Sequence, residues 1–291
     1  MTFKTYAAAR IAAACALTLA ACATAPGGRH AASPGPDPQL EAKAQAFESF
    51  MRRGRSISPE FSGPSEVSDA LAAGASYEPV ALESGMIAYA ALAALQEPRF
   101  VASVRATARG RGGPDLARRL AIQPDSIGDL PGARAAEARA SAALSRQGEA
   151  LASGGKAVKA ASYGIQRQAW AKAKVADPQA RLARVKQIGG IGPRPSGAVL
   201  YRTAAAGPVG GGTGSPVVRR GVALAALSLL GSRDRAGSLT TEPKSAMCLR
   251  LAKLNFHQCL ASAGPYYEDI YCLGQHAMID PGRCVTEAAV R

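Results

Sequence analysis

The sequence predicts a mainly α-helical protein: an irregular helical body with Gly/Pro-rich loops and a C-terminal disulfide-stapled helical hairpin. Three observations predict this class. Apolar residues recur at helical spacing in most segments, no convincing pair of strands is found, and four cysteines cluster near the C-terminus. Hydrophobic residues make up 47% of the 291 residues but aromatic residues only 5%. Much of the hydrophobic share is alanine, so a dense aromatic core is excluded.

The N-terminus has the pattern of a signal peptide over residues 1–21. Lys4 and Arg10 give it a positive start, and the apolar segment 11–19 is too short to span a membrane. The segment ends in LAAC, with Cys22 as the last residue. This ending resembles the lipobox of bacterial lipoproteins, and the resemblance covers the signal only.

The lipobox resemblance implies that Cys22 is acylated and becomes the first residue of the mature chain. Because Ala23 rather than aspartate follows, it also implies a lipid-anchored, periplasm-facing protein of the outer membrane. Two or more acyl chains hold a protein on a bilayer stably, whereas one binds only marginally. An ordinary secretory signal with a chance cysteine is the alternative.

Composition divides the mature chain into regions. Proline and glycine are dense in residues 22–39 and 207–216, which predicts extended or flexible segments there. The expected regions are a lipid-anchored tether over 22–39, a helical body over 40–206, a flexible linker over 207–216, an apolar helix and connector over 217–243, and a four-cysteine helical hairpin over 244–291.

Charge is distributed unevenly along the chain, which carries 35 basic and 21 acidic residues, a formal net charge of +14. Residues 99–235 hold 23 basic and 7 acidic side chains, a net charge of +16. Residues 23–98 hold 5 basic and 9 acidic, and residues 236–291 hold 5 of each. The helical body is therefore basic from about residue 99. An anionic lipid or cell-wall polymer is the partner expected for such a region, and solvated helix faces are the alternative.

The helices of the body follow from spacing, caps and breakers. Asp37-Pro38 is a typical helix start, and the nearly apolar segment 79–96 predicts a helix buried among others. Gly154-Gly155 is expected to separate two alanine-rich helices. The expected helices are 38–54, 79–96, one beginning near 100, 131–153, 156–176, 177–188 and 222–230.

The hairpin contains Cys248, Cys259, Cys272 and Cys284, an even set in an exported chain, where disulfides are permitted. Cys248 and Cys259 share one expected helix and lie about 16 Å apart, which is too far for a disulfide.

The pairing of these cysteines follows from the geometry of an antiparallel hairpin. Expected helices over 244–263 and 266–278 are joined by a turn at Gly264-Pro265. Two residues that face each other in such a hairpin lie equally far from the turn, so every facing pair has the same sum of residue numbers. This rule favours the nested pairs Cys259–Cys272 and Cys248–Cys284. Pro281-Gly282 is expected to end the second helix before Cys284. The spacing is similar to that of the twin-cysteine coiled-coil-helix family but differs from it in the number of intervening residues. The similarity therefore indicates a common geometric constraint on stapled hairpins and not membership of that family.

A metal site competes weakly with the disulfides. His257, Cys259, Cys272 and His276 could form a Cys2His2 set, but no tight Cys-x-x-Cys knuckle is present. No catalytic motif with an assigned acid and base is found. We therefore expect no cofactor, no metal and no enzymatic activity.

One glycine-rich segment resembles the helix-hairpin-helix signature of DNA-binding proteins, IGGIGPRPS over 188–196. The resemblance implies that backbone N–H groups of the turn contact a phosphate, with basic side chains beside it. Pro195 removes one N–H, and an ordinary glycine-rich turn is the favoured interpretation. The residues of this candidate anion-binding site are Arg181, Arg184, Lys186, Gly190, Gly192 and Arg194.

The sequence therefore predicts a lipid-anchored envelope protein with a structural or adaptor role. Its basic helical body is expected to bind an anionic envelope component or another envelope protein. A periplasmic nucleic-acid-binding protein that uses the turn at 188–196 is the alternative, and an enzyme comes third.

Overall fold

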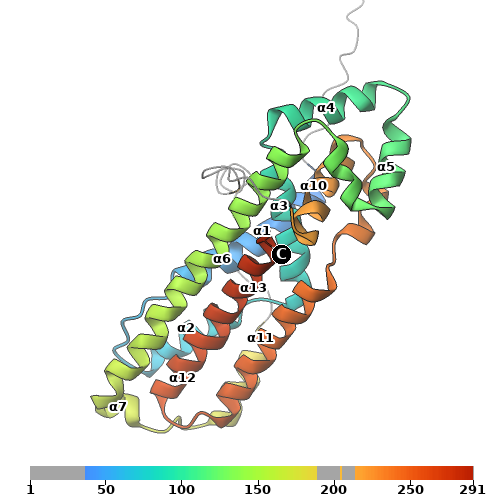
Figure 1. The fold of residues 1–291 in the computed structure, drawn as a ribbon. Helices are drawn as coiled ribbons and strands as arrows, with labels where there is room; N and C mark the ends of the chain where they lie inside the picture. The colour runs from blue at the N-terminus through green and yellow to red at the C-terminus, as the bar shows by residue number, and fades with distance from the viewer. Residues whose placement is uncertain (1–36, 189–203, 205–213, 291) are drawn as a thin grey trace, which may run out of the picture. The chain divides into compact units, whose positions relative to one another are not determined.

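Helices dominate the computed structural model, which describes residues 37–188, 204 and 214–290; among these residues there is no β-strand (Figure 1). The predicted mainly α class is confirmed. The described residues belong to one compact unit, Pro34–Arg291. Its α-helices are α1 (Pro38–Arg55), α2 (Pro64–Ala75), α3 (Pro79–Ala94), α4 (Pro98–Arg109), α5 (Gly113–Ile122), α6 (Ala133–Gly164), α7 (Ala169–Lys172), α8 (Pro178–Gln187), α10 (Pro216–Leu229), α11 (Pro243–Ser262), α12 (Tyr266–Cys272) and α13 (Asp280–Val290). The shorter helical segments are η1 (Pro124–Asp129), η2 (Ile165–Arg167), η3 (Arg233–Arg235), η4 (Gly237–Leu239) and the π-helical η5 (Leu273–Ile279).

Many of these helices begin at a proline that follows a capping side chain. Proline at the first helical position loses no hydrogen bond, because that N–H has no partner within the helix. The preceding carboxylate or hydroxyl accepts a hydrogen bond from an N–H of the first turn. The capping residues are Asp37 of α1, Glu78 of α3, Asp177 of α8, Ser215 of α10 and Glu242 of α11.

The core is centred on α3, which packs against α1, α6 and α10. Every residue from 85 to 94 is buried, as predicted for a helix that is apolar all round. A Cβ atom on Gly85 would lie 2.6 Å from the carbonyl oxygen of Lys43. The backbones of α1 and α3 therefore touch, and alanine and glycine, not aromatic residues, make this contact possible.

One long helix, α6, replaces the two that were predicted over 131–153 and 156–176. Gly154-Gly155 does not break it, because the missing side chains admit a neighbouring segment. A Cβ atom on Gly155 would lie 2.7 Å from the Cβ of Met278 and 2.8 Å from the carbonyl oxygen of Gly274. The contact with η5 thus overrides the low helix propensity of glycine. The helix ends at Gly164, earlier than the predicted end at 176.

The C-terminal hairpin runs along α6. In Figure 1, the continuous limb formed by α12, η5 and α13 lies beside α6, and α11 packs against the other side of this limb; the helix contacts agree. Pro281 does not end this limb, contrary to the prediction. Only Asp280 separates it from the π-helical turn of η5, where the α-helical hydrogen-bond ladder is already interrupted. The limb therefore continues to Val290.

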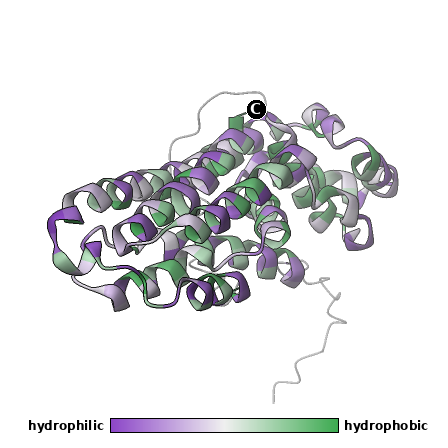
Figure 2. Ribbon diagram, turned by 90° about the horizontal axis from the view of Figure 1, so that it is seen from below, coloured by the Kyte–Doolittle hydropathy of each residue, from purple (hydrophilic) through white to green (hydrophobic). Residues whose placement is uncertain are grey.

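Hydrophilic and hydrophobic residues alternate along most helices (Figure 2), as expected for helices with one buried and one exposed face. Within the described residues no single helix has the length and hydropathy of a membrane span. Taken together, α3 and α4 have the length and hydropathy of a span, but the pair is bent by 92° and α3 is buried in the core.

Candidate anion-binding surface

Two disulfides join the limbs of the C-terminal hairpin. Cys248 of α11 is bonded to Cys284 of α13 with their Cα atoms 5.7 Å apart, and Cys259 is bonded to Cys272 with a Cα separation of 5.6 Å. This is the nested pairing that equal index sums favour. Cys284 lies on the continuing helix α13 and not in a turn, because Pro281 leaves the helix intact.

The Cys259–Cys272 disulfide occupies both sulfur atoms of the alternative Cys2His2 metal site. Neither Cys259 nor Cys272 offers a thiolate, and the other two members of that set face different surroundings. His276 forms a hydrogen bond from Nδ1 to Oδ2 of Asp280 at 2.7 Å. Burial, together with the charges of Lys253 and Lys186, lowers the pKa of His257 to about 4. Metal ligation by the four residues is therefore not supported.

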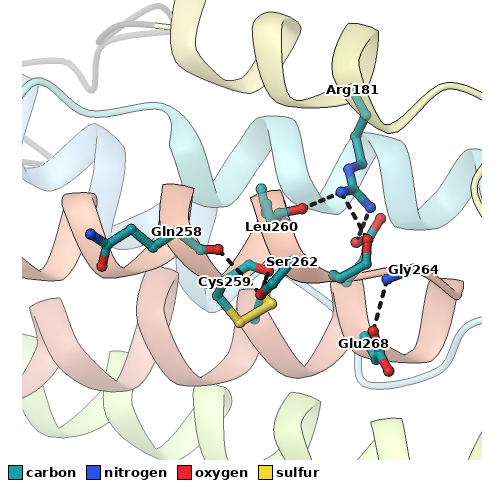
Figure 3. Close-up of polar contacts among 10 residues, drawn as sticks. Arg181, Gln258, Cys259, Leu260, Ser262, Gly264 and Glu268 are labelled. Atoms are coloured by element: carbon teal, nitrogen blue, oxygen red, sulfur yellow. Dashed lines mark hydrogen bonds and ion pairs between the residues drawn. A yellow bond between two sulfur atoms is a disulfide. The ribbon is translucent and has the colours of Figure 1, made fainter.

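The basic helix α8 is attached to the hairpin by Arg181 (Figure 3). Its Nη1 donates to Oδ1 of Asp269 on α12, and its Nη2 donates to the carbonyl oxygens of Leu260 and Ala263. The side chains of Arg181 and Asp269 are only 10% and 1% exposed. Arg181 is therefore committed to an internal ion pair and is not part of an external anion-binding site.

The Asp269 carboxyl is held in an unusual environment. Burial raises its pKa to about 6, although the charge and hydrogen bond of Arg181 act in the opposite direction. Its second oxygen, Oδ2, is buried without a hydrogen-bond partner, which is consistent with the direction of the shift. The ion pair therefore positions α8 against the hairpin, but removing the two charged groups from water costs free energy.

The other residues of the predicted turn site have different outcomes. Arg184 and Lys186 are exposed on α8, and Arg184 donates to the hydroxyl of Ser68 at 3.3 Å. Gly190, Gly192 and Arg194 lie outside the described residues, as do Cys22 and the tether up to residue 36. With Arg181 committed elsewhere, the described part of the chain offers no specific support for the helix-hairpin-helix resemblance.

A cluster of aromatic side chains with polar tips lies where α6, α7 and α12 meet. The rings of Tyr163 and Tyr271 are 6.2 Å apart at 77°, and those of Trp170 and Tyr266 are 6.4 Å apart. Tyr163 is 57% exposed, and the other three are partly buried. The backbones of Lys174 and Pro265 form an isolated antiparallel β-bridge, which brings the segment after α7 beside the start of α12.

One basic side chain contacts these rings, and others lie on the same segments of the chain. Lys159 places its Nζ 4.9 Å from the centroid of the Tyr271 ring and donates to Oε1 of Gln275 at 2.8 Å. The segment 150–176 contains five cations and no acidic residue. We define the aromatic–basic surface as the following residues: Lys159, Tyr163, Arg167, Trp170, Lys172, Lys174, Tyr266 and Tyr271.

The acidic residues close to the aromatic–basic surface are engaged within the protein. Asp177 caps α8 by accepting from the N–H of Ala180, and Glu268 accepts from the N–H of Gly264. Asp269 pairs with Arg181. Among the described residues, Arg167, Lys172 and Lys174 form no ion pair with a carboxylate and are exposed, so their positive charge is available to an external anion.

The sequence predicted a basic region but not this surface. Its cations come from α6 and the segment after it, whereas two of its four rings come from α12, about a hundred residues later. The density of tyrosine at 266–271 was the one local signal. Comparison of the chain with models of protein families, with curated proteins and with solved structures found no match.

Proposed function

We propose that the protein is a lipid-anchored envelope protein with a structural or adaptor role, and that its basic helical region binds an anionic envelope component. The observation that carries the proposal is the run of five cations without an acidic residue over 150–176, together with its exposure at Arg167, Lys172 and Lys174. The two disulfides support export to an oxidising compartment. The lipobox ending at Cys22 supports the anchor and a location in the outer membrane, facing the periplasm.

The anchor is tested by fractionation of the envelope and mass spectrometry of the N-terminal peptide. We expect the mature chain to begin at an acylated Cys22 and to fractionate with the outer membrane. A Cys22→Ser variant is expected to be released from the membrane fraction at high salt, where the acylated chain is retained, since the variant lacks the acylation site. An unacylated N-terminus that begins elsewhere in the wild-type chain would contradict the lipoprotein assignment.

The adaptor role is tested by purification from envelope extracts without a crosslinker, at low and at high salt, and a sample crosslinked in intact cells identifies the partners present there. We expect an envelope polymer, lipid or protein to copurify at low salt and to be released by salt, because exposed charge pairs are screened. A protein that is recovered alone at every salt concentration would count against a binding role.

A further inference from the structure

The aromatic residues of the described chain divide between the core and the aromatic–basic surface. All five described phenylalanines are buried in the core: Phe47, Phe50, Phe61, Phe100 and Phe256. Tyr77 and Tyr89 are buried with them, whereas the single tryptophan and three of the other tyrosines gather on the aromatic–basic surface. Tyrosine and tryptophan combine an apolar ring with a polar tip, which suits them to a boundary between an apolar and an aqueous phase.

The cations of the surface are arranged for the same kind of boundary. The ammonium group of Lys159 lies over the face of the Tyr271 ring, 4.9 Å from its centroid, so a cation and an aromatic ring are in direct contact. Lys172 and Lys174 are exposed on both sides of Ala173 and form no ion pair among the described residues. Half-buried aromatic rings beside lysines are the composition of protein segments that lie at membrane interfaces.

We propose that the aromatic–basic surface docks on the headgroup region of a membrane that contains anionic lipid. This inference rests on the proposed function and specifies its partner. Anionic headgroups attract each lysine or arginine that lies within a Debye length, and the tyrosine and tryptophan rings enter the interface. Duplex DNA would contact the cations alone, because its bases are stacked inside the helix. Single-stranded nucleic acid and glycans also stack on aromatic rings, so the test below compares vesicles with sacculi and DNA.

The length of the tether allows this contact on the membrane that holds the anchor. Asp37, at the start of α1, forms an ion pair with Arg233, whereas the surface begins near the C-terminal end of α6. The 32 residues of α6 measure about 48 Å. The 14 residues of 23–36 can reach about 50 Å when extended. An anchored chain can therefore bring the surface to the same bilayer, where a lipid chain and a basic patch act as two signals.

The test uses the mature chain 22–291 with Cys22→Ser, exported on an unrelated signal peptide so that the disulfides form and no lipid is attached. It is titrated with vesicles of phosphatidylcholine, with and without phosphatidylglycerol. Trp170 is the only tryptophan of the chain, so its fluorescence reports on the surface directly. We expect a blue shift of the Trp170 emission with phosphatidylglycerol vesicles and none with pure phosphatidylcholine.

The matched variants carry equal changes of net charge. Lys172→Gln with Lys174→Gln removes two exposed cations of the surface, whereas Arg105→Gln with Arg109→Gln removes two exposed cations of α4. We expect the first pair to weaken vesicle binding about 25-fold, at about fivefold per lysine, and the second to weaken it less than about twofold. Tyr163→Ser is expected to reduce the affinity as well, without changing the far-ultraviolet circular dichroism.

Each outcome decides the proposal. Equal loss in both charge variants would overturn the assignment to this surface while leaving the binding role of the basic region intact. Binding to peptidoglycan sacculi or to duplex DNA, but not to phosphatidylglycerol vesicles, would overturn the membrane as partner. Sacculi binding would still support the adaptor function, and DNA binding would not. Failure to bind vesicles, sacculi and DNA alike would overturn the membrane as partner, and if no envelope component copurified at low salt either, the proposed function would be overturned as well.

Discussion

Arg181 on α8 and Asp269 on α12 form a buried ion pair across 88 residues of sequence. The same guanidinium donates to the carbonyl oxygens of Leu260 and Ala263 at the end of α11. One side chain thus connects α8 to both limbs of the disulfide-bonded hairpin. Because α8 otherwise has a single fully buried residue, Val185, this connection determines where the helix lies.

The Arg181→Met substitution should destabilise the protein by about 3 kcal/mol at pH 8, because it leaves the Asp269 carboxylate buried without its counter-charge. The free energy of unfolding from urea titration measures the effect. Arg184→Met, one turn further along α8 and exposed, is the matched control and should cost less than about 0.5 kcal/mol. Equal effects of the two substitutions would show that the ion pair does not hold α8.

The Asp269 carboxyl should make the free energy of unfolding depend on pH. Its pKa rises from 3.8 in the unfolded chain to about 6 in the folded protein, because the group is buried. A group with a raised pKa stabilises the fold below its unfolded pKa and loses that contribution as the pH rises through its folded pKa. The free energy of unfolding should thus decrease by up to about 3 kcal/mol between pH 4 and pH 6 from this group.

The Asp269→Asn variant isolates this contribution, since asparagine does not titrate. The difference between the wild-type and variant free energies should change over this pH window and be constant above about pH 7. Parallel curves from pH 4 to pH 7 would mean that Asp269 has the same pKa in the folded and unfolded chains.

The two disulfides should contribute unequally to stability. The Cys248–Cys284 bridge closes a loop of 36 residues and the Cys259–Cys272 bridge a loop of 13. In the chain-entropy model, replacing both cysteines of a bridge by serine then costs about 4 kcal/mol for the longer loop and about 3 kcal/mol for the shorter. Guanidinium titration of the two double variants tests the order, and a larger loss from the shorter loop would contradict it.

Two glycines of α6 should respond in opposite ways to substitution by alanine. Gly155→Ala introduces a Cβ atom 2.8 Å from the backbone oxygen of Gly274 and should destabilise by about 1–3 kcal/mol. Gly164→Ala meets nothing within 4 Å and should stabilise by up to about 1 kcal/mol through helix propensity. Thermal unfolding of the two variants provides the comparison. A stabilised Gly155→Ala variant would show that α6 and η5 are not closely packed.

The helices could be predicted largely from local sequence, because their causes are local. Apolar spacing and the Asp37-Pro38 and Asp177-Pro178 starts placed α1 and α8 to within a few residues. Helix geometry alone also favoured the disulfide pairing, since depth in a hairpin is a function of residue number. The region of α2 was not predicted as a helix, because its glycine and serine content hides a short apolar stripe.

Residue order on its own thus accounts for the helical class, the basic region and the cysteine pairs, which all depend on periodicity, composition or spacing. Tertiary packing decided the rest. Gly154-Gly155 stays helical because η5 packs against it, and Pro281 is accommodated by the π-helical turn before it. Arg181 is withdrawn from solvent by Asp269, and the rings of α12 join the lysines of α6 and α7. Each of these depends on contacts between distant segments, for which no local pattern exists.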